Sequence, residues 1–589
     1  MDGAGAPTQQ QIEAAVRAYL ARVARRYLPL LVAAVVLVVI VLTVPTATQQ
    51  RQSPAFNGLS STGTGTGTGT GTTGTGTGTV GAGPQGASVG GGAPGPANGS
   101  TTGGGSTSAA AGGSGATGIT APSSNGIARS GVHCGPGKHQ VTWSVYAPPC
   151  VAKYTGNNGG ATSRGVTGNT ITLSYRITTS ADDAAISAAT GSAAPPKDSQ
   201  FIADLNTYVN YFNNQFELYG RKVVIKPYNG TGDYIQEDQG QGADRAQADA
   251  ATAHAEGAFG DVTFQLRGSN PYWTALAQQH IVAWGPLGFP TSYYEHYAPY
   301  WYSVTPSGST VAGFFANLTC RRLAGMDAVF SPDVTYQHTV RKFGLIHPNN
   351  PEYVAIANDI KHRLSACGVG ITREAEYSIN VAQYQTEATN MVAQMQAKGV
   401  TTVLCYCDPV VPIFLGNAAQ SQQYNPEWVQ PYWGDPQARQ PESGNWRGVI
   451  SDGIQWPTKS NNEAYRVYEL ASHNGTPHEQ YFAAAYAEIM QVFIGLQAAG
   501  PDLTPTSMLR GYQSLPNTGG GQVGRWSYQG NYVFTPQVST TVAYFDPSYA
   551  SNFDGMKGGY RYCDSGRVFT FADAESWGGP RQQMHCFGK

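Results

Sequence analysis

Cysteine is the residue type in this chain that could most readily support redox or metal chemistry. The chain holds eight cysteines, an even number, and all of them follow a long apolar run near its start. Cys405-Tyr406-Cys407 brings two thiols together, but no second cysteine pair or histidine pair lies at a zinc-ligand spacing, so neither a metal nor a cofactor is expected. In an oxidising compartment the cysteines are expected to form disulfides.

Two disulfides would tie down the irregular end segments of the globular part. These are Cys134 with Cys150 and Cys563 with Cys586, whose surroundings have little periodicity of their own. No role can be assigned to these end segments from their composition.

Catalysis would need a nucleophile beside a positioned base, and no such pattern is present. Gly86-Ala87-Ser88-Val89-Gly90 matches a hydrolase elbow, but it lies in a low-complexity spacer without the strand, turn and helix that the motif requires. The remaining candidates are scattered histidines outside any metal or triad motif: His254, His280, His296, His338, His347, His362, His473 and His478. We therefore expect a protein that is not an enzyme, with a secreted hydrolase as the least favoured hypothesis.

The apolar run from Tyr27 to Val44 is expected to cross a membrane once. Its 18 residues reach about 27 Å as a helix, close to the thickness of a hydrocarbon core of about 30 Å. Four arginines between residues 17 and 26 precede the run and only Arg51 follows it closely, which favours a cytoplasmic N-terminus. The alternative is a cleaved secretory signal, for which the small residues Pro45-Thr46-Ala47 would suit cleavage.

The order of segments predicts a tethered extracytoplasmic domain at the cell membrane. Residues 1–26 would be a cytoplasmic tail, 27–45 a signal-anchor helix and 46–130 a disordered linker rich in Gly, Thr and Ser. Residues 131–589 would form the extracytoplasmic domain. That domain is larger than one ordinary hydrophobic core supports, which suggests two lobes. The net charge of −2 does not indicate nucleic-acid binding.

Short β-rich runs alternate with amphipathic segments in the first part of the domain. Thr170 to Tyr175 is expected to be a strand, and the apolar positions from Ile202 to Phe216 recur at helical spacing. Val223 begins the next strand, and Asp261 to Leu266 and Ile281 to Trp284 are expected to be further strands. Strands that alternate with helices predict a parallel sheet.

A second progression of the same kind follows. Lys342 to Ile346 and Val400 to Tyr406 are expected to be strands, with helices between them. A long helix from Glu479 to Ala499, and strands near Tyr532 to Phe534 and Thr541 to Phe545, would close the domain. The fold class is therefore α/β, with two parallel-sheet lobes joined by several crossings of the chain.

This order of segments resembles the type I periplasmic-binding-protein fold, specifically the Leu/Ile/Val-binding-like substrate-binding subunits of ABC transporters. The resemblance covers roughly Gly165 to Phe545 and depends on order and spacing rather than on one diagnostic stretch. The segments that carry it are Thr170 to Tyr175, Val223 to Gly230, Asp261 to Leu276, Lys342 to Tyr353 and Val400 to Asp408.

The resemblance implies that two lobes close on a small molecule, with ligand groups on loops at the C-terminal ends of the strands. The loop Gly268-Ser269-Asn270-Pro271 matches the position that binds a ligand carboxylate through a hydroxyl and a backbone N–H. In amino-acid binders an acidic residue near the position of Asp435 holds the ligand ammonium. The implied ligand-binding residues are Ser269, Asn270, Trp284, Tyr353, Tyr406, Asp408 and Asp435.

Each of these residues also has a structural explanation. Ser269 and Asp408 lie where a helix needs an N-cap, and Asp435 precedes a proline in a turn. Trp284 and Tyr353 could fill the wall between the lobes. The aromatic-dense segment from Tyr293 to Tyr302 could line the cleft or pack as a hinge-side segment.

We therefore expect a membrane-tethered solute-binding protein that captures an amino-acid-like or related solute for an ABC permease or a signalling membrane protein. The alternative is a cell-surface interaction or structural protein with a degenerate binding-protein fold, which would bind no small molecule.

Overall fold

The computed structural model describes residues 122–183, 198–408, 410–431, 449–453, 463–472, 482–520, 523–550, 557–570, 582 and 584–586. All of them belong to one compact unit, Ala109–Lys589. The predicted signal-anchor helix at 27–45, the predicted linker up to residue 121 and the predicted ligand residue Asp435 lie outside the described residues. Among the described residues, no helix is long and apolar enough to span a membrane.

The first lobe, called lobe 1 here, is built on a parallel sheet with the strand order β4-β3-β5-β6-β7. This is the doubly wound order 2-1-3-4-5, in which helices cover both faces of the sheet. The strands are β3 (Thr170–Ile177), β4 (Lys222–Asn229), β5 (Gly260–Asp261), β6 (Val282–Trp284) and β7 (Trp301–Tyr302).

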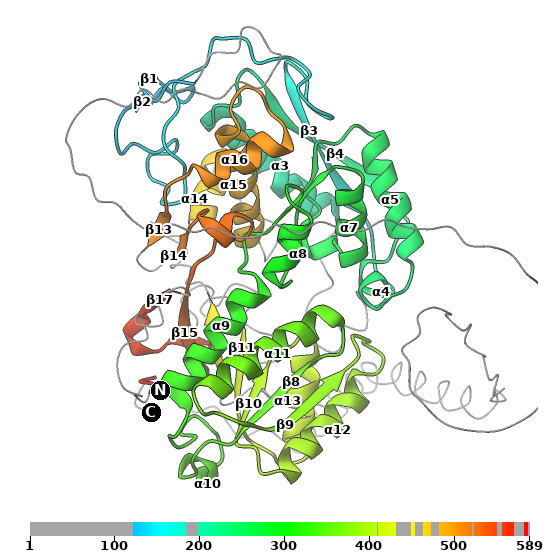
Figure 1. Cartoon of the computed structure of the whole chain (residues 1–589), viewed down its shortest axis with the longest axis vertical. Coiled ribbons are helices and arrows are strands. Elements are labelled where there is room, and N and C mark those ends of the chain that lie inside the picture. Colours follow the sequence, from blue (N-terminus) through cyan, green and yellow to red (C-terminus); the bar gives the residue numbers. More distant parts are fainter. Residues whose placement is uncertain are drawn as a thin grey trace, which may run out of the picture. The chain divides into compact units, whose positions relative to one another are not determined.

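The helices between these strands are α3 (Asp198–Gln215), α4 (Tyr234–Asp238), α5 (Ala243–Ala255), α6 (Phe264–Arg267), α7 (Asn270–Gln278) and α8 (Thr291–His296). Helix α5 packs against α7 on one side of β3 and β4, and α3 packs against the later helices α14 and α15 on the other side (Figure 1).

The predicted strand from Asp261 to Leu266 is wrong beyond its first residue. Strand β5 ends at Asp261, and α6 begins at Phe264. The Asp261 carboxylate accepts a hydrogen bond from the backbone N–H of Thr263 at 3.0 Å, which turns the chain away from the sheet.

The chain passes from lobe 1 to the second lobe, called lobe 2, through residues 303–307 and then enters α9 (Gly308–Leu318). A Cβ atom at Gly308 would clash with the Gly288 carbonyl and with the Ile356 side chain. Only glycine therefore fits where this crossing passes between the two lobes. The short π-helix η1 (Thr319–Leu323) continues α9.

Lobe 2 has a sheet with the strand order β16-β15-β12-β11-β10-β8-β9, and β17 also pairs with β15. Strands β8 to β12 are mutually parallel and repeat the order of lobe 1, whereas β15 is antiparallel to β12. The parallel strands are β8 (Phe343–Pro348), β9 (Ile371–Tyr377), β10 (Thr402–Cys405), β11 (Glu427–Pro431) and β12 (Val449–Gly453). The antiparallel strands are β15 (Ser539–Ala550), β16 (Lys557–Tyr562) and β17 (Val568–Thr570).

Helices cover both faces of the lobe 2 sheet. Apolar side chains of α9 and of α11 (Pro351–Ala366) share one core with Leu345 of β8. Those of α12 (Tyr384–Ala397) and α13 (Val411–Ser421) share a second core with Ile346. Successive residues of a strand point to opposite faces, so one buried strand contributes to both cores. A short helix, α10 (Val334–Gln337), precedes β8.

The chain then returns to lobe 1 and crosses once more to lobe 2. Helices α14 (Glu463–Ala471), α15 (Phe482–Ala498) and α16 (Pro505–Gln513) pack into the lobe 1 core, and α15 confirms the predicted long helix. The hairpin of β13 (Thr518–Gly520) and β14 (Val523–Trp526) and the 3-10 turn η4 (Gly530–Val533) follow before β15.

The strand predicted near Tyr532 to Phe534 is wrong, whereas the strand predicted over Thr541 to Phe545 is confirmed within β15. In the segment from Tyr532 to Phe534, the Thr535 N–H donates a hydrogen bond to the Tyr532 carbonyl at 3.1 Å. The backbone therefore closes a turn instead of pairing with a neighbouring strand.

All eight cysteines form disulfides, as expected for an oxidising compartment. Cys134–Cys150 and Cys563–Cys586 confirm the two predicted pairs. Cys134 ends β2 (His133–Cys134), which pairs with β1 (Gly126–Ile127). The other two disulfides are Cys320–Cys367 and Cys405–Cys407, so the Cys405-Tyr406-Cys407 motif is a disulfide at the end of β10.

Candidate functional site

Ser269 lies at the N-terminus of α7 in lobe 1, as the N-cap of that helix. Its hydroxyl accepts a hydrogen bond from the Tyr272 N–H at 3.3 Å and donates one to the Glu237 carboxylate. Its side chain is fully buried. The structure thus places Ser269 within lobe 1, where both of its hydrogen bonds go to protein groups.

The partner of Ser269 belongs to a buried ionic network. Arg176 donates to both oxygens of Glu237, at 3.0 and 3.1 Å, and to Asp249 at 3.4 Å. The guanidinium also lies over the ring of Tyr272, 3.9 Å from its centroid. A buried charge is stable only when it is paired, so this network fixes α4, α5 and α7 relative to the end of β3.

Asn270 lies beside the carboxylate of Asp238, the last residue of α4. The Asn270 N–H donates to Asp238 Oδ1 at 2.8 Å, and the Asn270 side-chain oxygen accepts from the Thr274 hydroxyl at 3.3 Å. Burial raises the pKa of Asp238 to about 7. The hydrogen bond from Asn270 lowers this pKa, whereas the charges of Glu237 and Glu352 raise it. This carboxyl therefore changes its charge near neutral pH.

Glu352 belongs to lobe 2, at the start of α11, and its influence on Asp238 shows that the two lobes approach each other here. Burial also raises the pKa of the half-buried Glu352. Ile235 of α4 packs against the second core of lobe 2, which independently places α4 against that lobe. The Glu352 carboxyl group of lobe 2 thus lies close enough to Asp238 of lobe 1 to act on it electrostatically.

Tyr353 and Tyr406 stand beside these carboxyl groups in lobe 2. Their ring centroids are 5.6 Å apart, and Asp238 and Glu352 both act electrostatically on Tyr353. The Tyr406 hydroxyl donates to the Gly288 carbonyl of lobe 1 at 3.0 Å, which joins the end of β10 to the loop after β6. We call Asp238, Asn270, Glu352, Tyr353 and Tyr406 the inter-lobe cluster.

Asp408 is buried directly behind the inter-lobe cluster. Its Oδ1 accepts from the backbone N–H groups of Val410 and Val411 at 2.8 and 3.2 Å, at the start of α13. Its Oδ2 accepts from the Tyr377 hydroxyl at 2.6 Å. Burial raises the pKa of Asp408 in spite of these hydrogen bonds. The Asp408 carboxyl group also acts electrostatically on Tyr353, which belongs to the cluster.

Trp284 is part of the lobe 1 core. It is fully buried, its indole N–H donates to the Tyr512 hydroxyl at 3.3 Å, and its ring stacks on Tyr302. The aromatic-dense segment around it is largely core as well, because Tyr294, Trp301 and Tyr302 are fully buried. Tyr293, Tyr297 and Tyr300 are only partly buried, and Tyr293 lies close enough to Glu352 for that carboxylate to add to the effect of burial on its pKa.

The structure therefore brings Asn270, Tyr353 and Tyr406 together, with Asp408 behind them, and places Ser269 and Trp284 inside lobe 1. Sequence reasoning missed Asp238 and Glu352. Glu352 adjoins the predicted Tyr353 at a helix start after a strand, a signal that could have identified it. Asp238 follows β4 by nine residues, and only the packing of Ile235 on lobe 2 identifies its loop as inter-lobe.

Two doubly wound lobes joined by three crossings, with polar groups of both lobes meeting at strand ends, define a two-lobed binding protein. The family model for periplasmic binding proteins matches residues 184–533, more than half of the chain. The chain belongs to that family, and its fold is the type I periplasmic-binding-protein fold. It is a solute-binding protein with an extracytoplasmic domain. A search of curated proteins gives no match.

Solved structures with a similar fold include solute-binding proteins of ABC transporters. A substrate-binding protein of a fatty-acid ABC transporter from Thermomonospora curvata is 13% identical, with a TM-score of 0.49, over 72% of this chain and 98% of its own. A protein from R. palustris in complex with 4-hydroxybenzoate is 12% identical, with a TM-score of 0.48, over 68% and 97%. A protein from Brucella ovis that binds Leu, Ile, Val, Thr and Ala is 14% identical, with a TM-score of 0.46, over 71% and 98%.

Proposed function

We propose that this protein captures a small amine-bearing solute, such as an amino-acid-like compound, between its two lobes. The observation that carries the proposal is that Glu352 of lobe 2 acts electrostatically on Asp238 of lobe 1, beside the packing of Ile235 on lobe 2. Two like charges brought together by closure repel each other. A cation between them converts this repulsion into attraction and so favours the closed arrangement of the lobes.

The tyrosines of the inter-lobe cluster suit the same ligand. A cation is attracted to the face of an aromatic ring by about 0.5–2 kcal/mol, and Tyr353 and Tyr406 offer two rings next to the carboxyl groups. Asn270 retains its amide group as a hydrogen-bond donor for a hydroxyl or carboxylate of the solute. The chemistry of such a site is capture without turnover.

We propose further that residues 27–45 hold the protein on the membrane and that an ABC permease receives the solute. This rests on the apolar run, the arginines before it and the spacer after it. Deletion of residues 27–45, with a cleavable secretion signal in their place, should move the protein from the membrane fraction to the medium. If the unaltered chain instead gives a protein in the medium that lacks its first 45 or so residues, the segment is cleaved.

Ligand screening of the full-length protein tests the proposed function. Melting temperature is measured with separate pools of amino acids, polyamines, amino sugars, neutral sugars, aromatic acids and fatty acids. A ligand at 100 times its Kd should add about 2.7 kcal/mol of stability. We expect a hit in an amine-bearing pool.

Three variants then test the site. Asp238→Asn and Glu352→Gln should each weaken binding of the amine, whereas Asp244→Asn, which removes an exposed carboxylate from α5, should leave it unchanged. If only acidic solutes bind, the proposed amine-bearing ligand class is wrong, whereas the proposed capture of a small solute still holds. If no pool raises the melting temperature, the alternative is favoured, namely a cell-surface interaction or structural protein that binds no small molecule.

A further inference from the structure

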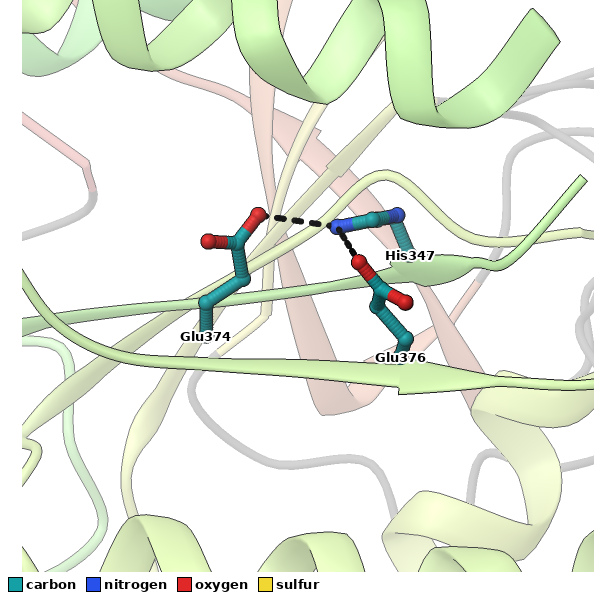
Figure 2. A group of neighbouring side chains, drawn as sticks. All are labelled: His347, Glu374 and Glu376. Carbon is teal, nitrogen blue, oxygen red and sulfur yellow. Dashed lines mark hydrogen bonds and ion pairs between the residues drawn. The ribbon is translucent and has the colours of Figure 1, made fainter. Parts of the chain in front are cut away.

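Three potential metal-ligating side chains, none of them part of the inter-lobe cluster, meet on two neighbouring strands of lobe 2. His347 is the fifth residue of β8, and Glu374 and Glu376 are alternate residues of β9, which is the edge strand. The register pairs His347 with Glu376 and Leu345 with Glu374. Alternate residues share one face of a sheet, so both carboxylates extend toward the imidazole, as Figure 2 shows.

A backbone carbonyl fixes the orientation of the histidine ring. His347 is fully buried, and its Nδ1 lies 2.8 Å from the Pro348 carbonyl oxygen. A carbonyl only accepts hydrogen bonds, so Nδ1 carries a proton. In the neutral ring the other nitrogen, Nε2, then presents a lone pair. This arrangement, with Nδ1–H donating to a carbonyl, is the one that orients histidines in metal sites.

Nε2 of His347 faces two carboxylate groups. Nε2 lies 3.1 Å from Glu374 Oε1 and 3.9 Å from Glu376 Oε1. With the ring neutral, these three atoms are all acceptors and none can donate to another. A cation placed among them would satisfy all three.

The distances suit a transition-metal ion. Nitrogen and carboxylate oxygen bind Zn²⁺ at about 2.0–2.2 Å, so two ligand atoms of one ion lie within about 4.4 Å of each other. The three atoms lie within 4.8 Å of one another. Glu376 is exposed, so a small rotation of its side chain can complete the approach. Its exposure also leaves room for water on the ion.

A lysine competes for the same carboxylate. Lys361 of α11 donates to both oxygens of Glu374, at 2.7 and 2.9 Å. Without an ion, a protonated His347 together with Lys361 could balance the two glutamates as an ordinary ion-pair network. The two arrangements make opposite predictions for the removal of Lys361.

We propose that His347, Glu374 and Glu376 form a binding site for one divalent transition-metal ion of the Zn²⁺ type. Three protein ligands with an open position for water is the ligand number of catalytic zinc sites, whereas structural zinc sites have four protein ligands. The ion would clamp the edge strand β9 to β8. The site is independent of the solute proposal, since it shares no residue with the inter-lobe cluster.

Calorimetric titration of Zn²⁺ into full-length protein tests the site, with a protein that carries no polyhistidine tag and has been dialysed against EDTA. We expect one ion per chain, no comparable binding of Mg²⁺, and a loss of at least about tenfold in affinity in Glu376→Gln, since even outer partners of ligands give 10–100-fold effects. His362→Ala, which removes an exposed histidine of α11, should bind as the parent does. Glu376→Gln alters an exposed side chain and should fold normally.

Lys361→Met separates the metal site from the ion-pair network. If the carboxylates bind an ion, removal of the competing ammonium should raise the Zn²⁺ affinity. The proposal is overturned if the parent protein shows no saturable Zn²⁺ binding, if Glu376→Gln and His347→Gln both bind as the parent does, or if Lys361→Met binds no more tightly.

Discussion

At the scale of single residues, the inter-lobe cluster contains a carboxyl group, that of Asp238, whose pKa is raised. Burial raises the pKa of Asp238 to about 7, against about 3.9 in an unfolded chain. Between these values the native state binds more protons than the unfolded state does. Stability should therefore fall as pH rises from about 4 to about 7 and should change little above that on account of this group.

Replacement of Asp238 should flatten this dependence. Asp238→Asn keeps the shape of the side chain but removes its charge, so its melting temperature should exceed that of the parent at pH 8 and approach it at pH 4. For a domain of 150–250 residues, 1 kcal/mol corresponds to about 2–4 °C. Thermal unfolding at both pH values checks this, with the exposed Asp244→Asn as the control. Equal slopes for the parent and Asp238→Asn would contradict the assignment.

Asp408 makes a second prediction at this scale. Tyr377→Phe would remove the hydroxyl that donates to Asp408 Oδ2 and that accepts from the Asp408 N–H at 2.9 Å. Both of these groups are buried, so the expected cost is about 1–3 kcal/mol of unfolding free energy. Urea unfolding measures it. A loss below about 0.5 kcal/mol, the low end for one hydrogen bond, would show that water replaces the hydroxyl.

At the scale of elements, the helices of lobe 2 are held by a disulfide as well as by packing. Cys320 in η1 and Cys367 at the end of α11 are bonded across 47 residues. Closing a loop of this length in the unfolded chain costs about 4 kcal/mol in the chain-entropy model.

The double variant Cys320→Ala/Cys367→Ala should therefore lose several kcal/mol of stability, seen as a lower melting temperature without reductant. The variant Cys134→Ala/Cys150→Ala is a matched comparison, with a shorter separation of 16 residues. By the same model it should lose less. A larger loss from the short loop would mean that native contacts, rather than loop closure, dominate.

At the scale of the whole molecule, the lobes are joined by three chain crossings and by few polar contacts among the described residues. The hydrogen bond from Tyr406 to the Gly288 carbonyl is such a contact. Tyr406→Phe should weaken solute binding by about 0.5–1.5 kcal/mol, up to roughly tenfold in Kd, because the closed arrangement loses a hydrogen bond.

A variant within one lobe provides the control for this effect. Tyr424 donates to the Val400 carbonyl at 2.7 Å, and both residues belong to lobe 2. Tyr424→Phe should lower the melting temperature and leave Kd nearly unchanged, whereas Tyr406→Phe should do the reverse. Equal effects of both variants on Kd would show that Tyr406 acts through lobe stability.

The sequence by itself determined the α/β class, the two lobes, the long helix α15 and the disulfides that tie the ends. The periodicity of strands and helices depends directly on the local backbone conformation. An even number of cysteines after an apolar run indicates an oxidising compartment. The strand near Tyr532 failed because one backbone hydrogen bond closed a turn, which periodicity cannot detect.

Only the tertiary structure decided which side chains face one another. Ser269 donates a hydrogen bond to Glu237, and Trp284 lies within the lobe 1 core; their proposed contact with the ligand stays a prediction. Glu352 acts electrostatically on Asp238 from 114 positions later, and His347 contacts Glu374 across 27 positions. The spacing of neighbours along the chain cannot reveal such pairs, because strand register and lobe packing bring distant residues together.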